Sequence, residues 1–375
     1  MRVMLYCQHV LGIGHFFRSM EIARAFHRHQ VLFVEGGEPL AGLRVPDHVS
    51  RAFLAPLRMD PQFLHLEADR GVVEAIQHQR REQLHDLYLG FQPDALIVEL
   101  YPFGRKRFGS EILPLLEHIR EHAPRTLVVC SLRDILVEKQ DQAAYEERVL
   151  KILNRYFNLL LIHSDPRVVA LAETFSRLAD IRIPVEYTGF VGRPANRPPD
   201  SLPGKRIVAS SGGGRVGIEL LAAAIGAVRR LPDPDLGMRV FIGPFMEQGD
   251  REFLSELARN DSRVTLLPFS LDFGSELAAA DLSISMAGYN TCMDIVCTGV
   301  RALVHPFRQN REQTLRAERL QSLGLLRILD NLDDVTLAED IQAALHNLPT
   351  KPRLVPDVRG AAKSAMLVES LAGSH

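Results

Sequence analysis

The chain lacks the features that mark nucleic-acid-binding, membrane-spanning and secreted proteins. Its formal net charge is -2 over 375 residues, so it has no global electrostatic attraction for nucleic acid. No stretch approaches the ~20 apolar residues that a membrane helix needs, and the apolar start at residues 2–7 lacks the basic segment and long apolar core of a signal peptide. The four cysteines show neither metal-ligand spacing nor a disulfide-scaffold pattern. We therefore expect a cytoplasmic protein with reduced cysteines and no nucleic-acid partner.

The chain instead alternates short apolar, β-rich segments with helical patterns. Continuous apolar strands separated by helices predict parallel sheets covered on both faces. Expected helices include residues 15–27, 109–121 and 216–230. The expected strands are residues 3–7, 30–34, 95–99, 126–131 and 159–163 in the first half, and 205–211, 239–242, 263–267, 281–286 and 301–305 in the second.

A proline-rich segment divides the chain into two α/β domains. Residues 192–204 hold four prolines, and proline suits neither a helix interior nor a central strand. We predict an N-terminal domain over residues 1–191, a linker over 192–204 and a C-terminal domain over 205–353. The last segment, residues 354–375, is compatible with a helix.

One glycine-containing turn ends the first apolar segment. Gly12, Gly14 and His15 lie where the chain enters its first helix, whose positive end disfavours an imidazolium by ~0.3 to 1 kcal/mol. His15 would then be a neutral base near pH 7, suited to removing a proton from an attacking hydroxyl. The same position is equally compatible with a histidine that caps its own helix.

Two turns of the second half are suited to phosphate. Residues 212–214 are three glycines directly after a strand, where backbone amides can approach an anion, and Arg215 could add a charged contact. Residues 287–291 end a later strand, with Asn290 or Thr291 capping a helix that Gly299 ends. Asp294 would lie in the first turn of that helix, either accepting ribose hydroxyls or complementing the helix dipole. For the glycines the alternative is a flexible turn.

Further polar groups follow other strands. Glu312 and Gln313 suit a hydroxyl-rich ligand, although such a segment is also typical of a solvated helix start. In the first half, residues 99–105 and 131–134 end successive strands, at the edge where open α/β sheets bind ligands. Residues 105–107 are basic with aromatic residues interleaved, so they could bind an anionic acceptor or a phospholipid surface; the alternative is a solvated basic loop. Arg133 and Asp134 could also be a local ion pair.

Taken together, these motifs resemble the GT-B glycosyltransferases of the MurG-like superfamily, related to glycosyltransferase family 28. The shared order is the Gly-x-Gly-His turn, Thr188-Gly189, the 212–214 glycines, and Ala-Gly-x-x-Thr-x-x-Asp followed by Gly, Pro-Phe and Glu-Gln. The resemblance implies a GT-B fold, in which two Rossmann-like domains with parallel sheets face a central cleft. It further implies an inverting transferase that takes a sugar from a nucleotide diphosphate sugar, with UDP the expected nucleotide.

The resemblance and the residue arguments assign site residues. The catalytic base is His15. Acceptor contacts are expected at Gly12, Gly14, Arg18, Glu99, Arg105 and Arg133. Donor contacts are expected at Gly213, Gly214, Arg215, Phe269, Gly288, Tyr289, Asn290, Thr291, Asp294, Glu312 and Gln313.

Departures from the family pattern keep other activities open. The family has a longer glycine run in its first loop and a glutamate in place of Asp294. No metal or other cofactor is expected, because Asp233 and Asp235 have metal-binding spacing but lie in a proline-bearing turn. The expected partners are the donor and an unknown hydroxyl acceptor, anionic or lipid-linked, with peripheral contact at the inner face of a membrane as a further option. A UDP-sugar hydrolase, in which Arg18 follows His15 by three residues, a 2-epimerase and a non-catalytic sugar-nucleotide-binding protein are the alternatives.

Overall fold

The structure is a computed structural model that describes residues 1–8, 14–36, 43–57, 70–137, 139–195, 204–347 and 352–373. It divides into two compact units: Met1–Val191 with Arg359–His375, and Gly192–Val358. The chain therefore passes between the units twice, between Val191 and Gly192 and again between Val358 and Arg359. Most of the linker expected at residues 192–204 lies outside the described residues.

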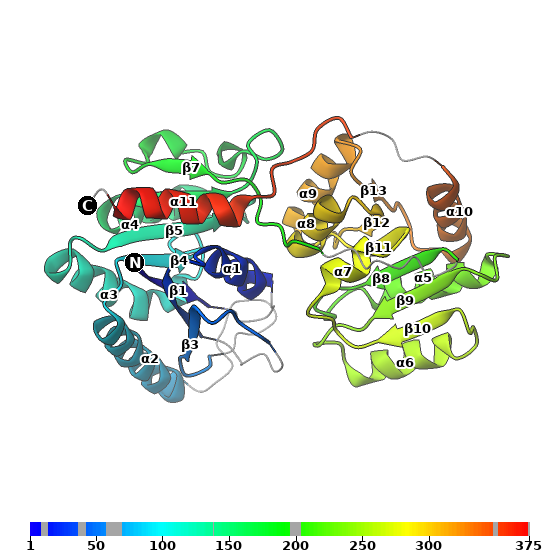
Figure 1. Cartoon of the computed structure of the whole chain (residues 1–375), viewed down its shortest axis with the longest axis horizontal. Helices are drawn as coiled ribbons and strands as arrows, with labels where there is room; N and C mark the ends of the chain where they lie inside the picture. Colours follow the sequence, from blue (N-terminus) through cyan, green and yellow to red (C-terminus); the bar gives the residue numbers. More distant parts are fainter. Residues whose placement is uncertain are drawn as a thin grey trace. The chain divides into compact units, whose positions relative to one another are not determined.

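The first unit contains a seven-stranded parallel sheet in the order β3-β2-β1-β4-β5-β6-β7. Helices α1 and α11 pack together on one face, and α2, α3 and α4 cover the other (Figure 1). The strands are β1 (Arg2–Cys7), β2 (Gln30–Glu35), β3 (Val49–Phe53), β4 (Ala95–Glu99), β5 (Leu127–Arg133), β6 (Leu159–His163) and β7 (Val185–Tyr187). The helices are α1 (Gly14–Ala25), α2 (Arg70–Phe91), α3 (Gly109–His122), α4 (Gln142–Tyr156) and α11 (Gly360–Ala372), with short 3-10 turns η1 (Lys106–Phe108), η2 (Leu171–Glu173) and η3 (Leu178–Asp180).

The second unit contains a six-stranded parallel sheet in the order β10-β9-β8-β11-β12-β13. Helices α5, α6 and α10 pack on one face, and α7, α8 and α9 follow one another on the other (Figure 1). Its strands are β8 (Arg206–Ser210), β9 (Gly237–Phe241), β10 (Val264–Leu267), β11 (Leu282–Met286), β12 (Arg301–His305) and β13 (Arg327–Ile328). Its helices are α5 (Ile218–Arg230), α6 (Gln248–Ala258), α7 (Phe273–Ala278), α8 (Tyr289–Thr298), α9 (Arg311–Ser322) and α10 (Asp334–His346).

Each sheet has one point where the strand order reverses direction. In the first unit this is between β1 and β4, and in the second it is between β8 and β11. Open α/β sheets bind ligands outside the carboxyl ends of the strands at such a point. Ligand binding is therefore expected at the loops that follow β1, β4, β8 and β11.

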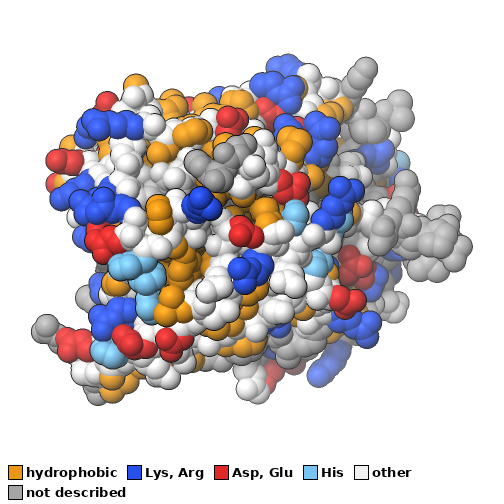
Figure 2. Space-filling model, turned by 60° about the vertical axis from the view of Figure 1, so that its left-hand side comes forward, with side chains coloured by type: hydrophobic (Ala, Val, Ile, Leu, Met, Phe, Trp, Pro, Cys, Tyr) orange, Lys and Arg blue, Asp and Glu red, His pale blue; other side chains and the backbone are white. Residues whose placement is uncertain are grey.

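The predicted α/β class with two parallel sheets is confirmed. Two central strands, β4 and β11, are buried along their whole length. The sequence did not reveal β3, because only one of its five residues is buried and it forms the sheet edge. Among the described residues, no helix is both long and apolar enough to cross a membrane. On the face shown in Figure 2, acidic and basic side chains are interspersed.

Candidate functional site

The reversal point of the first sheet brings His15 and Glu99 together. His15 is the second residue of α1 and Glu99 is the last residue of β4, so a sequence separation of 84 residues closes to 2.6 Å between His15 Nδ1 and Glu99 Oε1. Arg18, one turn along α1, donates to the same carboxylate oxygen. Glu99 and Arg18 are buried, whereas 20% of the His15 side chain stays exposed. The ring is thus held by a buried carboxylate and remains partly exposed.

Burial and the neighbouring charges together determine the protonation of this pair. Burial lowers the pKa of His15 to about 3; Glu99 works against that shift, and the charges of Arg105 and Arg18 add to it. Burial alone would raise the pKa of Glu99, but His15, Arg18 and Arg105 outweigh it and lower that pKa. At neutral pH the carboxylate is ionised and the imidazole neutral. Because ionised Glu99 accepts hydrogen bonds only, His15 donates from Nδ1 and its Nε2 is left as the basic atom.

The loop after β4 places Arg105 beside this pair. Leu100 and Arg105 both have left-handed backbone conformations, with φ of 64° and 59°. Each such conformation costs a non-glycine residue ~1 to 3 kcal/mol, so the surrounding contacts must hold it. Phe103 is buried, its carbonyl accepts from the Tyr145 hydroxyl at 2.8 Å, and the Gly104 amide donates to the Leu100 carbonyl at 2.8 Å.

The expected contribution of aromatic side chains to a surface in this loop is wrong. The side chains of Tyr101, Phe103 and Phe108 are 1 to 2% exposed and belong to the core of the first unit. The basic residues of the segment reach the surface, and Lys106 and Arg107 are more exposed than Arg105. The aromatic residues of this segment therefore serve the packing of the core.

Two buried networks support the carboxyl edge, and neither was found from the sequence. Arg80 of α2 is fully buried and donates to the Glu111 carboxylate. It also donates to one acceptor after each of three strands: Gln8 Oε1 after β1, at 2.6 Å, the Gly36 carbonyl after β2 and the Ala55 carbonyl after β3. A separate chain links Ser131 Oγ to His163 Nε2 at 2.7 Å and His163 Nδ1 to Thr188 Oγ1 at 2.9 Å. Only the Thr188-Gly189 motif gave a signal. The partners come from distant segments that no local pattern connects.

In the second unit, the glycine-rich turn lies at the other reversal point. It follows β8 and leads into α5, with φ of 69° at Gly212 and 87° at Gly214. A Cβ on Gly214 would lie 2.8 Å from Gly243 Cα, so the turn packs backbone against backbone on the loop after β9. Arg215 is exposed and its guanidinium lies 5.5 Å from the Phe245 ring centre. Amides at the start of a 13-residue helix thus face the carboxyl edge.

Helix α8 begins at the neighbouring turn, after β11. Its N-cap is Gly288, without a side-chain cap, and Tyr289, Asn290 and Thr291 form its first turn. The expected capping by Asn290 or Thr291 is therefore wrong, because the helix begins before both; Gly299 does end it, with φ of 67°. The positive end of the helix dipole lies at this first turn and favours a negative charge there.

Asp294 lies in the second turn of α8, not the first, and is buried. Arg193 holds it in a bidentate ion pair, with Nε 3.0 Å from Oδ1 and Nη2 bonded to Oδ2. Burial raises the pKa of Asp294 and Arg193 opposes that shift. The carboxylate proposed for ribose is therefore already occupied by a guanidinium in this structure.

Glu312 and Gln313 lie in the first turn of α9, after β12. Asn310 caps this helix by accepting from both of their backbone amides, at 3.1 and 3.3 Å. Glu312 is buried, which excludes the solvated helix start for this residue. Gln313 is half-buried and its Oε1 accepts from the Phe307 amide at 3.1 Å, leaving its NH2 group to donate.

The remaining predicted residues are scattered along the same edges. Gly14 begins α1, Arg133 ends β5, and Phe269 is half-buried in the loop after β10. Gly12 lies outside the described residues. Within the described ranges, no group of three or more His, Cys, Asp or Glu residues could hold a metal ion. Asp233 instead accepts from the Asp235 amide at 3.0 Å in a turn.

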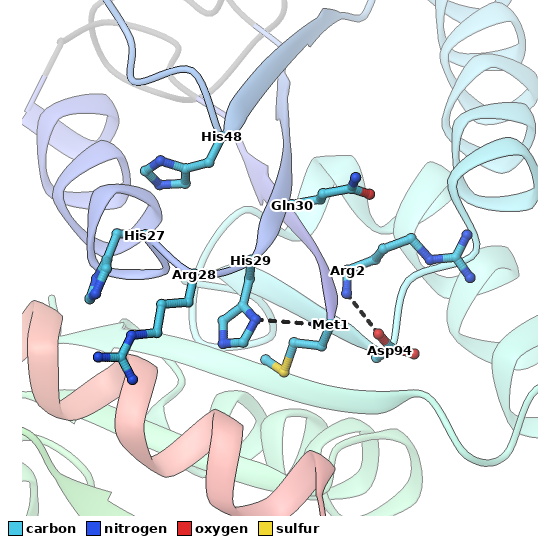
Figure 3. Close-up of a pocket in the computed structure, with 8 residues that line it drawn as sticks. All are labelled: Met1, Arg2, His27, Arg28, His29, Gln30, His48 and Asp94. Atoms are coloured by element: carbon cyan, nitrogen blue, oxygen red, sulfur yellow. Dashed lines mark hydrogen bonds between the residues drawn. The ribbon is translucent and has the colours of Figure 1, made fainter.

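A pocket at the opposite, amino-terminal edge of the first sheet contains none of the predicted residues (Figure 3). Its polar groups hold strand ends and α11 in place. Asp94 accepts from the Arg2 amide at 2.7 Å, and His29 lies between the Met1 amino group at 3.1 Å and Glu369 of α11 at 2.9 Å. The pocket is lined by Met1, Arg2, His27, Arg28, His29, Gln30, His48 and Asp94.

Comparisons with known proteins agree with this architecture. Residues 235–366 match the glycosyltransferase family 28 C-terminal domain. Similar solved structures include the calicheamicin glycosyltransferase CalG4, with 17% identity, a TM-score of 0.60 and coverage of 99% of this chain and 95% of that chain. The spinosyn rhamnosyltransferase SpnG has 16% identity, a TM-score of 0.56 and coverage of 100% and 96%. A UDP-glucosyltransferase from Polygonum tinctorium has 13% identity, a TM-score of 0.62 and coverage of 99% and 98%. No curated protein matches the sequence.

Proposed function

We propose that this chain, a glycosyltransferase of the GT-B type with a family 28 C-terminal domain, transfers a sugar from a nucleotide diphosphate sugar to a hydroxyl acceptor with inversion at the anomeric carbon. The observation that carries the proposal is the contact of 2.6 Å between His15 and Glu99 at the reversal point of the first sheet. It supplies a neutral, oriented base where an acceptor would bind.

The donor would bind the second unit. The helix starts at Tyr289 and at Ile218 offer backbone amides on both sides of the reversal point, and Arg215 adds a positive charge. These groups could meet the pyrophosphate charge without a metal ion. UDP is the proposed nucleotide on the strength of the family resemblance, and Gln313 is the proposed contact to sugar hydroxyls.

The chemical step follows from the orientation of His15. The acceptor oxygen attacks the anomeric carbon while its proton passes to Nε2 of the imidazole. The bond from the anomeric carbon to the phosphate oxygen breaks, and the nucleotide diphosphate leaves with that electron pair. Glu99 accepts from Nδ1 throughout and stabilises the imidazolium that forms, as the buried carboxylate does in other histidine bases.

The test combines binding and product analysis. A thermal-shift screen with different nucleotide diphosphates identifies the nucleobase of the donor, because a ligand at 100-fold its Kd stabilises the protein by ~2.7 kcal/mol. The protein is then incubated with the matching nucleotide sugar and hydroxyl compounds, charged and uncharged, and products are identified by mass spectrometry. We expect a glycosylated product and free nucleotide diphosphate in equal amounts. Equal release of free sugar without any acceptor would instead assign the site to hydrolysis, and absence of nucleotide binding would reject the donor site.

The cytoplasmic location and the membrane contact also stay proposals. The burial of Tyr101, Phe103 and Phe108 removes the aromatic contribution to membrane contact through this loop. A lipid-linked acceptor would then have to be recognised by its head group.

A further inference from the structure

We infer that Arg105 binds an oxyanion, a carboxylate or a phosphate, that the acceptor carries beside its reacting hydroxyl. The inference rests on the proposed function and specifies the charge of the acceptor. It starts from an atom: the Nε of Arg105 is buried and has no hydrogen-bond partner among the described residues. A buried donor of a charged group is costly to leave unpaired, and an oxyanion of the acceptor is the partner that we assign to it.

Arg105 belongs to a cluster of guanidinium groups. Arg18, Arg105 and Arg133 contribute three guanidinium groups at this edge, and Arg105 interacts electrostatically with both Glu99 and Arg133. The Glu99 carboxylate is already bonded to His15 and Arg18.

The position of Arg105 connects this guanidinium cluster to the reaction. The Arg105 guanidinium contributes to lowering the pKa of both His15 and Glu99, so it lies within electrostatic range of the proposed base. The Leu100–Arg105 turn is fixed by buried side chains and hydrogen bonds, as described above, so the guanidinium is presented by a rigid loop. A guanidinium binds carboxylate or phosphate through two parallel N–H donors, which also orients the rest of the ligand.

The direct test reads the Arg105 Nε–Hε signal by NMR in the full chain saturated with UDP, so that the nucleotide site is filled. Inorganic phosphate and benzoate are titrated separately as the two oxyanion probes. We expect a saturable shift of this signal with at least one probe. The variant Arg105→Met should weaken probe binding about 10-fold to 100-fold, as for loss of a charged hydrogen bond. Arg105→Lys should weaken it less, because lysine keeps the positive charge but lacks the two parallel N–H donors of a guanidinium.

Lys106→Met is the matched control, since Lys106 is the adjacent basic residue and is exposed. Unchanged probe affinity in this variant supports the inference. An Arg105 signal that does not respond to either probe, or equal losses in the two Met variants, overturns it. A fall in UDP affinity in Arg105→Met also overturns it, because Arg105 would then serve the donor. A chain that binds no UDP contradicts the proposed function separately, and the phosphate titration still reports on Arg105.

Vesicles of phosphatidylcholine with and without phosphatidic acid distinguish the two sources of phosphate. Co-sedimentation that needs both phosphatidic acid and Arg105 supports an acceptor on a lipid. Phosphate binding without vesicle binding supports a soluble acceptor. Vesicle binding that Lys106→Met abolishes as fully as Arg105→Met overturns recognition by Arg105.

Discussion

Arg193 donates to both carboxylate oxygens of Asp294, with its Nε 3.0 Å from Oδ1. Arg193 is the second residue of the second unit, and Asp294 lies on α8, whose first turn is the proposed pyrophosphate site. The ion pair thus fastens the beginning of the second unit to the helix that would bind the donor. A ribose hydroxyl that used Asp294 would have to share the carboxylate with this guanidinium.

The first prediction concerns the stability of this pair. Asp294→Ala and Arg193→Met should each destabilise the protein, because each leaves a largely buried charge or acceptor without its partner; breaking a buried pair costs up to ~3 to 5 kcal/mol, and less here because 17% of the Arg193 side chain is exposed. The double variant should be only slightly less stable than the less stable of the two single variants. Urea unfolding of the three variants and the wild type measures this coupling.

Calorimetry with UDP separates the ribose role from the ion pair. If Asp294 also binds ribose, Asp294→Ala should weaken UDP by roughly 1.5 to 3 kcal/mol, and Arg193→Met should not. Equal weakening in both variants would mean that Asp294 acts only by holding Arg193. No change in either would remove Asp294 from the donor site.

The second prediction concerns Gln313. Gln313→Ala should lower the affinity for the intact UDP-sugar and leave that for UDP nearly unchanged, because only the sugar is proposed to reach its NH2 group. The variant also loses the hydrogen bond from the Phe307 amide. Gln321→Ala is the matched control, since Gln321 lies on the same helix and accepts from the Ile328 amide at 2.6 Å. Equal losses for UDP and UDP-sugar would place Gln313 outside the sugar site.

The fold could be predicted because most buried strands are largely apolar segments and the turns that follow them contain glycine or polar residues. The turns at Gly14 and Gly288 were found this way, since local sequence determines them. Pairings across the sheet edge were not predictable. His15 meets Glu99 over 84 residues and Arg193 meets Asp294 over 101, and neither pair has a local pattern.

Two features that the sequence did not reveal have a common physical cause. Tyr101, Phe103 and Phe108 alternate with polar residues, and alternation alone cannot distinguish a surface loop from a tightly packed turn whose aromatic side chains point inward. Arg80 similarly belongs to a polar helix face in the sequence, yet it is fully buried because five acceptor atoms surround its guanidinium. Burial of a charged residue depends on partners that only the fold brings together.

The third prediction is that His163 makes the protein less stable in acid. Burial, with the charge of Arg18, lowers the pKa of His163 to about 3. In the unfolded chain the ring takes up a proton near pH ~6.5, so stability is retained above about pH 6.5 and falls as the pH drops from there toward 3. Above that range the ring is neutral in both states and contributes no pH dependence.

His163→Gln should remove up to one proton from this linkage, about 1.4 kcal/mol per pH unit of slope. Urea unfolding of the wild type and variant from about pH 7 to about pH 4 measures the slope. The exposed His27→Gln provides the control. Identical slopes for wild type and His163→Gln would contradict the assigned shift.

The last prediction separates catalysis from structure at His15. His15→Gln should leave UDP binding unchanged, because the proposed nucleotide site lies on the other unit, and should reduce transfer by the ~100-fold to 10,000-fold that a positioned base supplies. A histidine that only capped its helix would cost about 1 kcal/mol of stability and little rate. Glu99→Gln should instead reduce both rate and stability, because it removes the charge that orients Nδ1–H and leaves Arg18 buried without an anion.

Since the pKa of His15 is lowered to about 3, its protonation should not reduce kcat/KM as the pH falls through about 6.5. Single-turnover rates, unfolding midpoints and a pH profile of the two variants and the wild type measure all three effects. A near-normal rate in folded His15→Gln, or an acid limb near pH ~6.5 that disappears in this variant, would contradict a neutral base held by Glu99.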